Sequence, residues 1–333
     1  MINIALFGLG RIGLMHGQNL FLHPQFKLKY VYDIDKSLTK KISKKFNCIG
    51  INNPSIALKD KNVQSIFIAT SIAAHIKFII EAVKHKKTVF CEKPLDLNID
   101  KINKCKKIIS NLNPRIQLGF NRRHDPGHNS LKKYLDNGKI GKLEKIIITS
   151  RDPKPPPLSY LKSSGGIFKD MMIHDFDLIR FYLGADELNT IIATASNISN
   201  KRFSKIKDFE LATCVLKSKK GVQCVITNSR HCSFGYDQRV ELFGTKGMVI
   251  SDNKREKETS IYNKSTTSMK TPLMNFFIER YKEAYKLQLN DLIKLVKKNI
   301  RPLANFEDGR RAIIIANSAE KSLKNKKIEK ITF

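Results

Sequence analysis

Residues 2–13 of this chain, INIALFGLGRIG, decide its fold. The apolar run INIALF predicts a buried β-strand. Gly8, Gly10 and Gly13 follow with the spacing GxGxxG, and the next stretch, LMHGQNLFL, continues as a helix. A strand, a glycine-rich turn and a helix in this order are typical of a dinucleotide-binding fold. The sequence therefore predicts a Rossmann domain at the N-terminus.

Each glycine of this turn has a separate task. Gly8 permits the tight turn, Gly10 lets a pyrophosphate approach the backbone, and Gly13 allows the helix to pack closely on the strand. The phosphates are expected at the helix N-terminus, where free N–H groups point at them. The cofactor contacts that we expect here also include Arg11 and Ile12, the first residues of the helix.

The cofactor preference follows from the second strand, FKLKYVYD, which ends in Asp33. A carboxylate at this place accepts hydrogen bonds from the adenosine ribose and repels a 2′-phosphate. Asp35 adds a second negative charge, whereas Lys36 and Lys40 act in the opposite sense. These lysines lack the fork of arginine, so we expect them to soften the preference without reversing it. We predict NAD as the cofactor, with NADP as a weaker alternative.

Strands and helices go on alternating up to residue 120, with the strands VQSIFIAT, TVFCEKP and RIQLGF. This order predicts parallel pairing in a doubly wound sheet, whose ligands bind at the carboxyl ends of the strands. The polar residues at those ends are Thr70, Ser71, Glu92, Lys93, Asn121, Arg122 and Arg123. We expect Thr70, Ser71, His75, Glu92 and Lys93 to contact the cofactor.

The pattern changes after the arginine pair of FNRR. The strand LEKIIITSRD and the loop PKPPP are followed by a helix, then by four β-rich runs, and the chain closes with helices over about 275–299 and 307–325. Strands in succession predict an α+β domain with a large, mostly antiparallel open sheet. We therefore expect a Rossmann domain over residues 1–121 and a substrate-binding and oligomerisation domain over residues 122–333.

The helix of the second domain reads GGIFKDMMIHDFDLIRF, residues 165–181. Helical spacing places Asp170, His174 and Asp177 on one stripe, with Asp175 on its flank. The residues expected on the opposite, packed side are Met172, Ile173, Phe176, Ile179 and Leu183. The polar stripe is either a solvated face or the lining of a pocket. Solvent faces of this chain are mostly lysine, which favours the pocket.

Composition narrows the class of protein. The 333 residues, 41% of them hydrophobic, contain no apolar run long enough for a membrane span and no signal peptide at the start. Six cysteines without metal-ligand spacing indicate a reducing cytoplasm and argue against a metal site. The net charge of +31 is spread along the chain without aromatic interleaving, which argues against nucleic acid as the partner.

These motifs resemble one family. The segments GLGRIGLMHG, CEKPL, GFNRRHDPGH, SRDPKPPP, GGIFKDMMIHDFDLIRF and GYDQRVELFGTKGM are similar, from end to end, to the glucose–fructose oxidoreductase and inositol dehydrogenase family. EKP and DxxxH belong to the wider family, whereas RRHDPG, SRDP and GYDQRVELFG are closer to its inositol 2-dehydrogenase branch. The resemblance implies NAD-dependent oxidation of myo-inositol to 2-keto-myo-inositol in inositol catabolism, and a homotetramer formed through the open face of the second sheet.

The resemblance also implies residue roles. The motif lysine, aspartate and histidine of the catalytic triad are here Lys93, Asp170 and His174, and the Lys93–Pro94 bond is expected to be cis. The residues implied as substrate contacts are Lys93, Asn121, Arg122, Arg151, Asp170, His174 and Tyr236. The chain departs from the family at Asn121, where an apolar residue is usual, and at His124, where an aromatic is usual.

Two alternatives stay open. Within enzymes, the substrate could be scyllo-inositol or another sugar or polyol. From another class, the same scaffold serves non-catalytic sugar sensors that bind NAD(P). The intact set of Lys93, Asp170 and His174 argues for an enzyme, because oxidation of an alcohol needs a base beside the hydroxyl, and imidazole titrates near neutrality.

Overall fold

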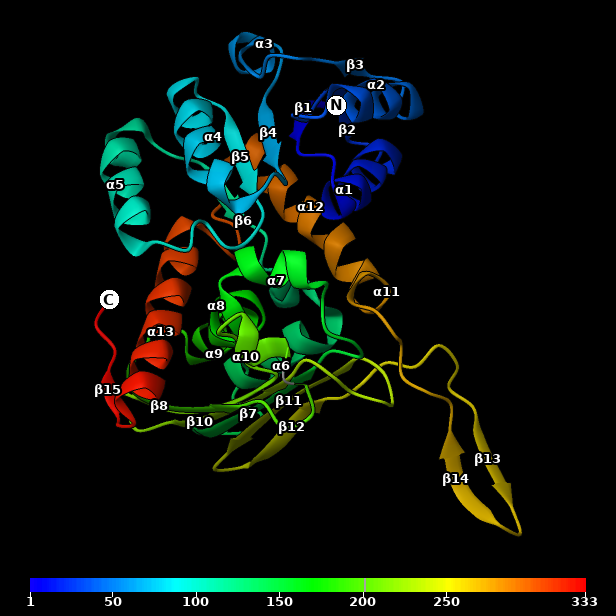
Figure 1. Ribbon diagram of the computed structural model, residues 1–333, viewed down its shortest axis with the longest axis vertical. Helices are drawn as coiled ribbons and strands as arrows, with labels where there is room; N and C mark the ends of the chain where they lie inside the picture. The colour runs from blue at the N-terminus through cyan, green and yellow to red at the C-terminus, as the bar shows by residue number, and fades with distance from the viewer. Residues whose placement is uncertain (201) are drawn as a thin grey trace. The chain divides into compact units, whose positions relative to one another are not determined.

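The computed structural model describes residues 1–200 and 202–333 (Figure 1). The chain forms two compact units, the first of residues 1–124 and 284–311 and the second of residues 125–283 and 312–333. This division differs from the expected one chiefly in residues 284–311, which return to the first unit. The reason is α12 (Lys282–Lys298), whose Leu289, Leu292 and Ile293 pack in the first unit's core.

The first unit is built on a six-stranded sheet in the order β3-β2-β1-β4-β5-β6, with every neighbouring pair parallel. Its strands are β1 (Ile2–Phe7), β2 (Phe26–Tyr32), β3 (Ile49–Gly50), β4 (Ser65–Ile68), β5 (Thr88–Cys91) and β6 (Ile116–Leu118). β1, β4 and β5 are buried almost throughout, as parallel strands covered on both faces require. The doubly wound sheet predicted from the alternation is confirmed.

Helices connect these strands. They are α1 (Arg11–Leu22), α2 (Lys36–Lys45), α3 (Ser55–Lys59), α4 (Ile72–Lys84) and α5 (Ile99–Ile109), followed by the short helices η1 (Ser110–Leu112) and η2 (Asn121–His124). Two helix starts are capped by side chains: Asp35 accepts from backbone N–H groups of α2 and Asn98 from those of α5. Asp35, expected to bear on cofactor choice, thus also begins the helix after β2.

The second unit contains a seven-stranded sheet in the order β12-β11-β7-β10-β9-β8-β15. Its strands are β7 (Leu143–Arg151), β8 (Leu188–Ser196), β9 (Leu211–Ser218), β10 (Gln223–Ser229), β11 (Asp237–Gly244), β12 (Gly247–Ser251) and β15 (Glu329–Lys330). All neighbours are antiparallel except β7 and β10. The mostly antiparallel sheet expected for this domain is confirmed, and the short β15 was not predicted.

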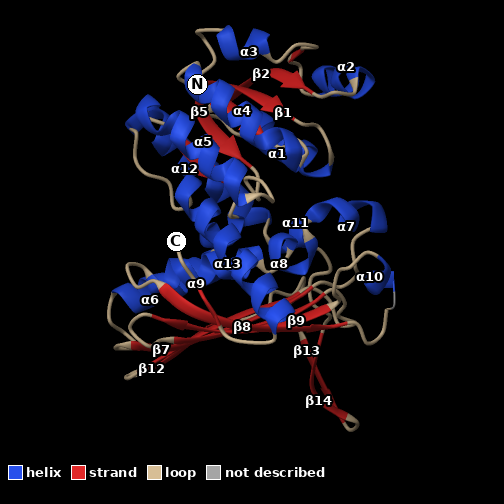
Figure 2. Ribbon diagram, turned by 60° about the vertical axis from the view of Figure 1, so that its left-hand side comes forward, coloured by secondary structure: helices blue, strands red, loops and turns tan. Residues whose placement is uncertain are grey.

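One face of this sheet is covered by helices, and its other face carries none among the described residues (Figure 2). The helices of the unit are α6 (Pro126–Asp136), α7 (Leu158–Ser164), α8 (Gly166–Asp170), α9 (Ile173–Leu183), α10 (Arg202–Lys205), α11 (Phe277–Arg280) and the larger part of α13 (Phe306–Asn325). Alternate residues of the strands join α6, α8, α9 and α13 in one apolar cluster. A hairpin of β13 (Ser260–Asn263) and β14 (Thr266–Lys270) projects from the unit (Figure 1).

The prediction of one continuous helix over residues 165–181 is wrong. The chain forms α8 and α9, separated by a turn at Met171 and Met172, where the N–H of Met172 donates to the carbonyl of Ile167, five residues back. The expected packed side is confirmed, because Met172, Phe176 and Ile179 are fully buried. However, Asp175 and Asp177 are also buried, so the polar residues do not form one exposed stripe.

Candidate functional site

The turn after β1 has the shape that a dinucleotide pyrophosphate needs. Gly8 lies at φ +93°, where side chains are strained, and a Cβ on Gly13 would come within 2.0 Å of the Gly8 carbonyl oxygen. In contrast, a Cβ on Gly10 would meet nothing within 4 Å. The backbone is thus open at Gly10, at the N-terminus of α1, where free N–H groups bind phosphates. Arg11 and Ile12 are the first residues of that helix.

Asp33 follows β2, and its carboxylate is fixed by the backbone. The N–H of Leu9 donates to Oδ2 at 2.7 Å, and the N–H of Asp35 donates to Oδ1 at 3.0 Å. Each carboxylate oxygen keeps a lone pair that can accept from a ribose hydroxyl. The first of these bonds also ties the end of β2 to the glycine-rich turn. The turn and Asp33 therefore fit an NAD cofactor together.

Thr70 and Ser71 follow β4, and His75 lies one turn into the next helix, α4. The His75 ring is buried, with Nδ1 at 2.8 Å from the carbonyl oxygen of Pro94 and Nε2 at 3.1 Å from that of Thr70. Burial lowers the pKa of His75, and this outweighs the two carbonyl contacts, which raise it. The neutral ring carries a single N–H, which donates to one of these two carbonyl oxygens, while the other ring nitrogen lies against the second.

Glu92 and Lys93 follow β5, and the Lys93–Pro94 bond is cis, as expected. Glu92 accepts from the N–H of Lys93 at 3.3 Å, and its Oε1 lies 2.7 Å from Nε2 of His16 on α1. His16 is fully buried among the rings of Phe67, Phe90 and Tyr285. The sequence reasoning missed His16, although its place on the helix of the glycine-rich motif made it a candidate.

The helix η2 holds the residues expected after β6. Asn121 and Arg122 are both buried in it. Arg123 forms an ion pair with Asp308 at 3.2 Å, and Nε2 of His124 lies 3.1 Å from Oδ2 of Asp291. The departure from the family at His124 therefore has a structural use inside the first unit, where imidazole and carboxylate hold η2 against α12.

Asp170 ends α8 in the second unit and is 8% exposed. The hydroxyl of Tyr160 donates to its Oδ1 at 2.7 Å, and Nη1 of Arg230 donates to its Oδ2 at 3.3 Å. Arg230 also pairs with Asp208 at 3.2 Å. The sequence reasoning missed Tyr160, Asp208 and Arg230. The only signal in the sequence was Arg230 itself, a charged residue at the end of the β-rich run GVQCVITNSRH.

His174 lies in the first turn of α9 and is partly buried. Its neighbour Asp175 is fully buried and accepts from the hydroxyl of Ser150 at 2.7 Å and from Nδ2 of Asn228 at 2.8 Å. Ser150 belongs to β7 and Asn228 to β10. Asp175 therefore fixes the start of α9, and with it His174, on the two parallel strands of the sheet.

The structure brings Arg151 and Tyr236 together, because Arg151 of β7 pairs in register with Asp237 of β11. Nη1 of Arg151 lies 2.9 Å from Oδ2 of Asp237. Burial raises the pKa of Asp237, but hydrogen bonds from Arg239 and Asn253 and the nearby arginine charges outweigh it and hold the pKa below its ordinary value. Tyr236 precedes Asp237 in the chain and is buried, and its ring lies edge-on to that of Tyr281 with 6.1 Å between the ring centroids.

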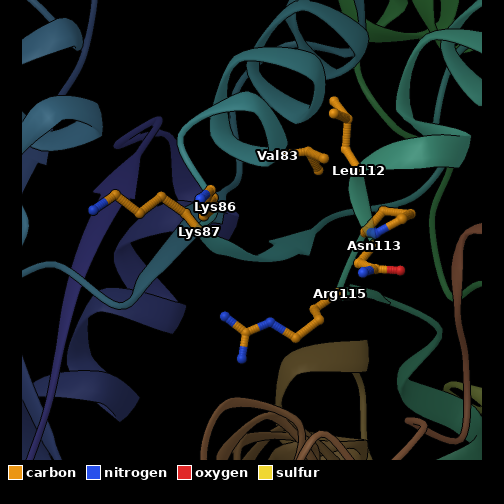
Figure 3. A pocket seen from close by; sticks show the side chains of 7 residues that line it. Val83, Lys86, Lys87, Leu112, Asn113 and Arg115 are labelled. Carbon is orange, nitrogen blue, oxygen red and sulfur yellow. The ribbon is translucent and has the colours of Figure 1, made fainter.

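Two adjoining hollows of about 340 and 440 Å³ lie elsewhere in the first unit. Figure 3 shows the smaller one. Both are lined by Lys86, Lys87 and Arg115, which precede β5 and β6. They therefore open at the amino ends of the strands, whereas cofactors of such sheets bind at the carboxyl ends. In the described part of the chain, no cluster of three or more His, Cys, Asp or Glu side chains is arranged for a metal ion. Nor does any described helix combine the length and apolar character needed to cross a membrane.

Two family models match successive parts of the chain. Residues 2–120 match the oxidoreductase family with an NAD-binding Rossmann fold, and residues 128–250 match the GFO/IDH/MocA C-terminal domain. A myo-inositol 2-dehydrogenase of Thermotoga maritima is 37% identical over 331 residues, which cover 99% of this chain and 98% of that protein.

Solved structures agree over the whole chain. The crystal structure of a myo-inositol dehydrogenase from Corynebacterium glutamicum superposes with a TM-score of 0.95 at 34% identity, covering 100% of this chain and 99% of that one. A scyllo-inositol dehydrogenase from Lactobacillus casei, with bound NAD(H) and scyllo-inositol, gives 0.92 at 26% identity, with 99% of each chain covered. The chain described here belongs to the GFO/IDH/MocA family of NAD-binding oxidoreductases.

Proposed function

We propose that this protein is an inositol 2-dehydrogenase, which oxidises myo-inositol to 2-keto-myo-inositol with NAD in inositol catabolism. The observation that carries the proposal is the 37% identity, over nearly the full length of both chains, to a myo-inositol 2-dehydrogenase. The open backbone at Gly10 and the fixed carboxylate of Asp33 support NAD as the cofactor. NADP is the weaker alternative, because its 2′-phosphate would meet that carboxylate.

The first unit is proposed as the NAD-binding domain. The glycine-rich turn and the N-terminus of α1 hold the pyrophosphate, and Asp33 holds the adenosine ribose. NAD, when bound, accepts the hydride that leaves the alcohol carbon. The residues proposed to bind it are Gly8, Gly10, Arg11, Ile12, Gly13, Asp33, Thr70, Ser71, His75, Glu92 and Lys93. His75 acts through the strand ends beside it, since its buried ring lies between the carbonyl groups of Thr70 and Pro94.

The second unit is proposed to supply the base. His174 takes the hydroxyl proton, since imidazole titrates near neutrality and Asp175 fixes the start of its helix. Asp170 binds the substrate and orients the base, and Lys93 of the first unit stabilises the alkoxide that forms. The further residues proposed as substrate contacts are Asn121, Arg122, Arg151 and Tyr236.

A second candidate is the oxidation of scyllo-inositol or another polyol. It is favoured by the likeness to the scyllo-inositol dehydrogenase and by Asn121, which departs from the family where the substrate is expected. A non-catalytic sugar sensor is disfavoured, because a sensor does not need a histidine held for proton transfer.

We also propose a homo-oligomer, and a tetramer as its form. The face of the second sheet without helices presents a row of strand-paired apolar residues: Ile192, Val215, Val225 and Ile147. A flat apolar row on a sheet is typical of contacts between copies of a chain. The cytoplasm is the proposed location, because the six cysteines are free, which suits a reducing compartment.

The proposal is tested by assaying a panel of inositol isomers and aldoses for formation of reduced cofactor, with NAD and with NADP. We expect myo-inositol with NAD to give the highest kcat/KM. A preference for scyllo-inositol would support the second candidate. Binding of NAD without turnover of any polyol would overturn the proposal in favour of a sensor.

A further inference from the structure

Arg230 is a charged side chain in the interior of the second unit. It follows β10, and only 1% of its surface is exposed. A buried guanidinium is stable only where carboxylates and hydrogen bonds replace its water shell. Arg230 has two such partners within the unit: Asp170 at 3.3 Å and Asp208 at 3.2 Å. One buried cation therefore serves two largely buried carboxylates.

The two carboxylates differ in their surroundings. Asp208 is 4% exposed and accepts from the backbone N–H groups of Ile167 and Phe209, both at 2.8 Å, through Oδ1. It is thereby fixed to the first turn of α8. Asp170 ends the same helix, and its carboxylate accepts from two side chains, the Tyr160 hydroxyl and the Arg230 guanidinium. Asp208 thus anchors Arg230, and Arg230 orients Asp170.

The backbone of Arg230 is also fixed. The N–H of Arg230 donates to the carbonyl of Glu210 at 2.8 Å, which continues the pairing of β9 and β10. The carboxylate of Glu210 in turn accepts from the backbone N–H groups of Ile198, Ser199 and Asn200. The arginine therefore projects from a rigid strand end, as a residue that sets the geometry of another group requires.

We propose that Arg230, held by Asp208, is the positioning residue of Asp170: it fixes this carboxylate in one orientation and keeps it ionised at neutral pH. This inference rests on the proposed function at one point, the assignment of Asp170 to the active site. Arg230 acts through Asp170 and is not itself a catalytic residue. Tyr160, which is 41% exposed, supplies the second and more accessible donor.

The charges around Asp170 can be named element by element. Tyr160 lies on α7, Lys169 precedes Asp170 on α8, and His174 lies in the first turn of α9. Asp208 precedes β9, and Arg230 follows β10. Lys169 pairs with Glu320 at 2.8 Å, so its charge is engaged away from Asp170. Removal of Arg230 would leave Asp208 and Asp170 together without their shared cation, and a carboxylate beside a like charge takes up a proton more readily.

The test measures the pH dependence of kcat/KM, at saturating NAD, for the unmodified protein and for variants at Arg230. Arg230→Met should move the acidic limb to higher pH, because a rise of about 1 to 3 units in the pKa of Asp170, the usual effect of losing an adjacent arginine, adds to the titration of the base His174. Arg230→Lys, which keeps a charge but loses the fork, should move it by less than about 1 unit. Tyr160→Phe should shift it in the same direction and by the smallest amount, with a nearly unchanged melting temperature because Tyr160 is partly exposed.

Arg310→Lys is the matched control. Arg310 also pairs with a carboxylate, Glu307 at 2.8 Å, and its side chain is 13% exposed, but Glu307 and its other partner, Asn103, both lie in the first unit. Arg310→Lys should lower the melting temperature without moving the acidic limb of the pH profile. Asp208→Asn is the substitute if Arg230→Met does not fold. It removes a negative charge and leaves Arg230 to Asp170 alone, so the acidic limb should move in the opposite direction, to lower pH. Lower melting temperatures with unchanged pH limbs in the Arg230, Asp208 and Tyr160 variants would make Arg230 a purely structural residue and overturn the inference.

A second measurement is independent of turnover. The Asp170 carboxyl carbon can be titrated by NMR, with its signal assigned from Asp170→Asn. The pH at which Asp170 takes up its proton should rise from the unmodified protein to Arg230→Lys and again to Arg230→Met. If no polyol is oxidised but the titration shifts, the proposed function fails and the inference stands. If polyols are oxidised and the titration does not shift, the inference fails and the proposed function stands.

Discussion

Gly10 and Gly13 belong to the same turn, yet their surroundings predict opposite results on substitution. Gly10→Ala adds a Cβ with nothing within 4 Å, at an ordinary φ of −65°, so the free energy of unfolding should change by less than about 0.5 kcal/mol. The same methyl group would occupy the open backbone that we assign to the pyrophosphate. The Kd for NAD should therefore rise at least about tenfold, or about 1.4 kcal/mol, by titration calorimetry.

Gly13→Ala is the companion experiment. Its Cβ would lie 2.0 Å from a backbone oxygen, which cannot rotate away, so α1 must shift. Overpacking of this kind costs about 1 to 3 kcal/mol. We expect a lower melting temperature as well as weaker NAD binding. Equal melting temperatures for the two alanine variants would contradict the geometry described for this turn.

The carboxylate of Asp33 predicts the cofactor preference. Asp33→Asn keeps an oxygen that can accept from the N–H of Leu9, but it removes the charge that opposes a 2′-phosphate. The ratio of kcat/KM for NAD to that for NADP should fall at least about tenfold, or about 1.4 kcal/mol. Asp33→Ser should lower this ratio as well. Equal use of both cofactors by the unmodified protein would show that this interpretation of Asp33 is wrong.

His174→Ala tests the base. The rate of polyol oxidation should fall about a hundredfold or more, the usual contribution of a positioned base. The proposed cofactor-binding residues all lie in the first unit, whereas His174 lies in the second, so the Kd for NAD should stay the same. A retained rate with a normal pH profile would remove His174 from the role.

At the scale of elements, Asp175 decides how firmly α9 is held. Asp175→Ala leaves the buried Ser150 hydroxyl and the Asn228 amide without their acceptor. Each abandoned buried donor costs about 1 to 3 kcal/mol, so we expect a loss of about 3 kcal/mol in urea unfolding. Ser150→Ala, which removes one donor and leaves the carboxylate bonded to Asn228, should cost only about 1 kcal/mol. An Asp175→Ala variant as stable as the unmodified protein would refute the anchoring role.

The elements also show where sequence reasoning reaches its limit. The glycine-rich turn, the parallel strands and the polar residues after them follow from local patterns, because each signal lies within a few residues. Arg230 could not be found this way: it lies 60 residues from Asp170 in sequence, and the pairing of β10 with β9 fixes the strand end that brings it there. The break between α8 and α9 was hidden for a related reason, since Met171 and Met172 are both buried and keep the apolar period intact.

At the scale of the whole molecule, each unit contains a carboxyl group whose pKa is about 2: Asp125 in the second and Glu307 in the first. Burial raises the pKa of Asp125, but the charges of His128 and Arg280 and a hydrogen bond from Arg280 outweigh it. For Glu307, burial is likewise outweighed, by hydrogen bonds from Arg310, Lys106 and Arg311. Both groups therefore stabilise the folded state in their charged form.

The sign of the pH dependence follows. A folded pKa below the unfolded value of about 4 adds stability above that pH, which is lost as the pH falls toward 2. Asp125, fully buried, should contribute about 2 kcal/mol. We expect urea midpoints to fall between about pH 5 and pH 2. Asp125→Asn should be less stable at pH 7 and should flatten this dependence. A midpoint independent of pH in the unmodified protein would contradict both assignments.

The return of residues 284–311 to the first unit has a consequence for synthesis on the ribosome. The last strand of the parallel sheet, β6, is translated by residue 118, but the core of that unit also needs Leu289, Leu292 and Ile293 of α12. At about 5 to 20 residues per second, translation of the intervening chain takes roughly 10 to 30 seconds. For that time the nascent sheet carries an uncovered apolar face, so the cofactor-binding half, although made first, is among the last parts to finish folding and the one most in need of a chaperone.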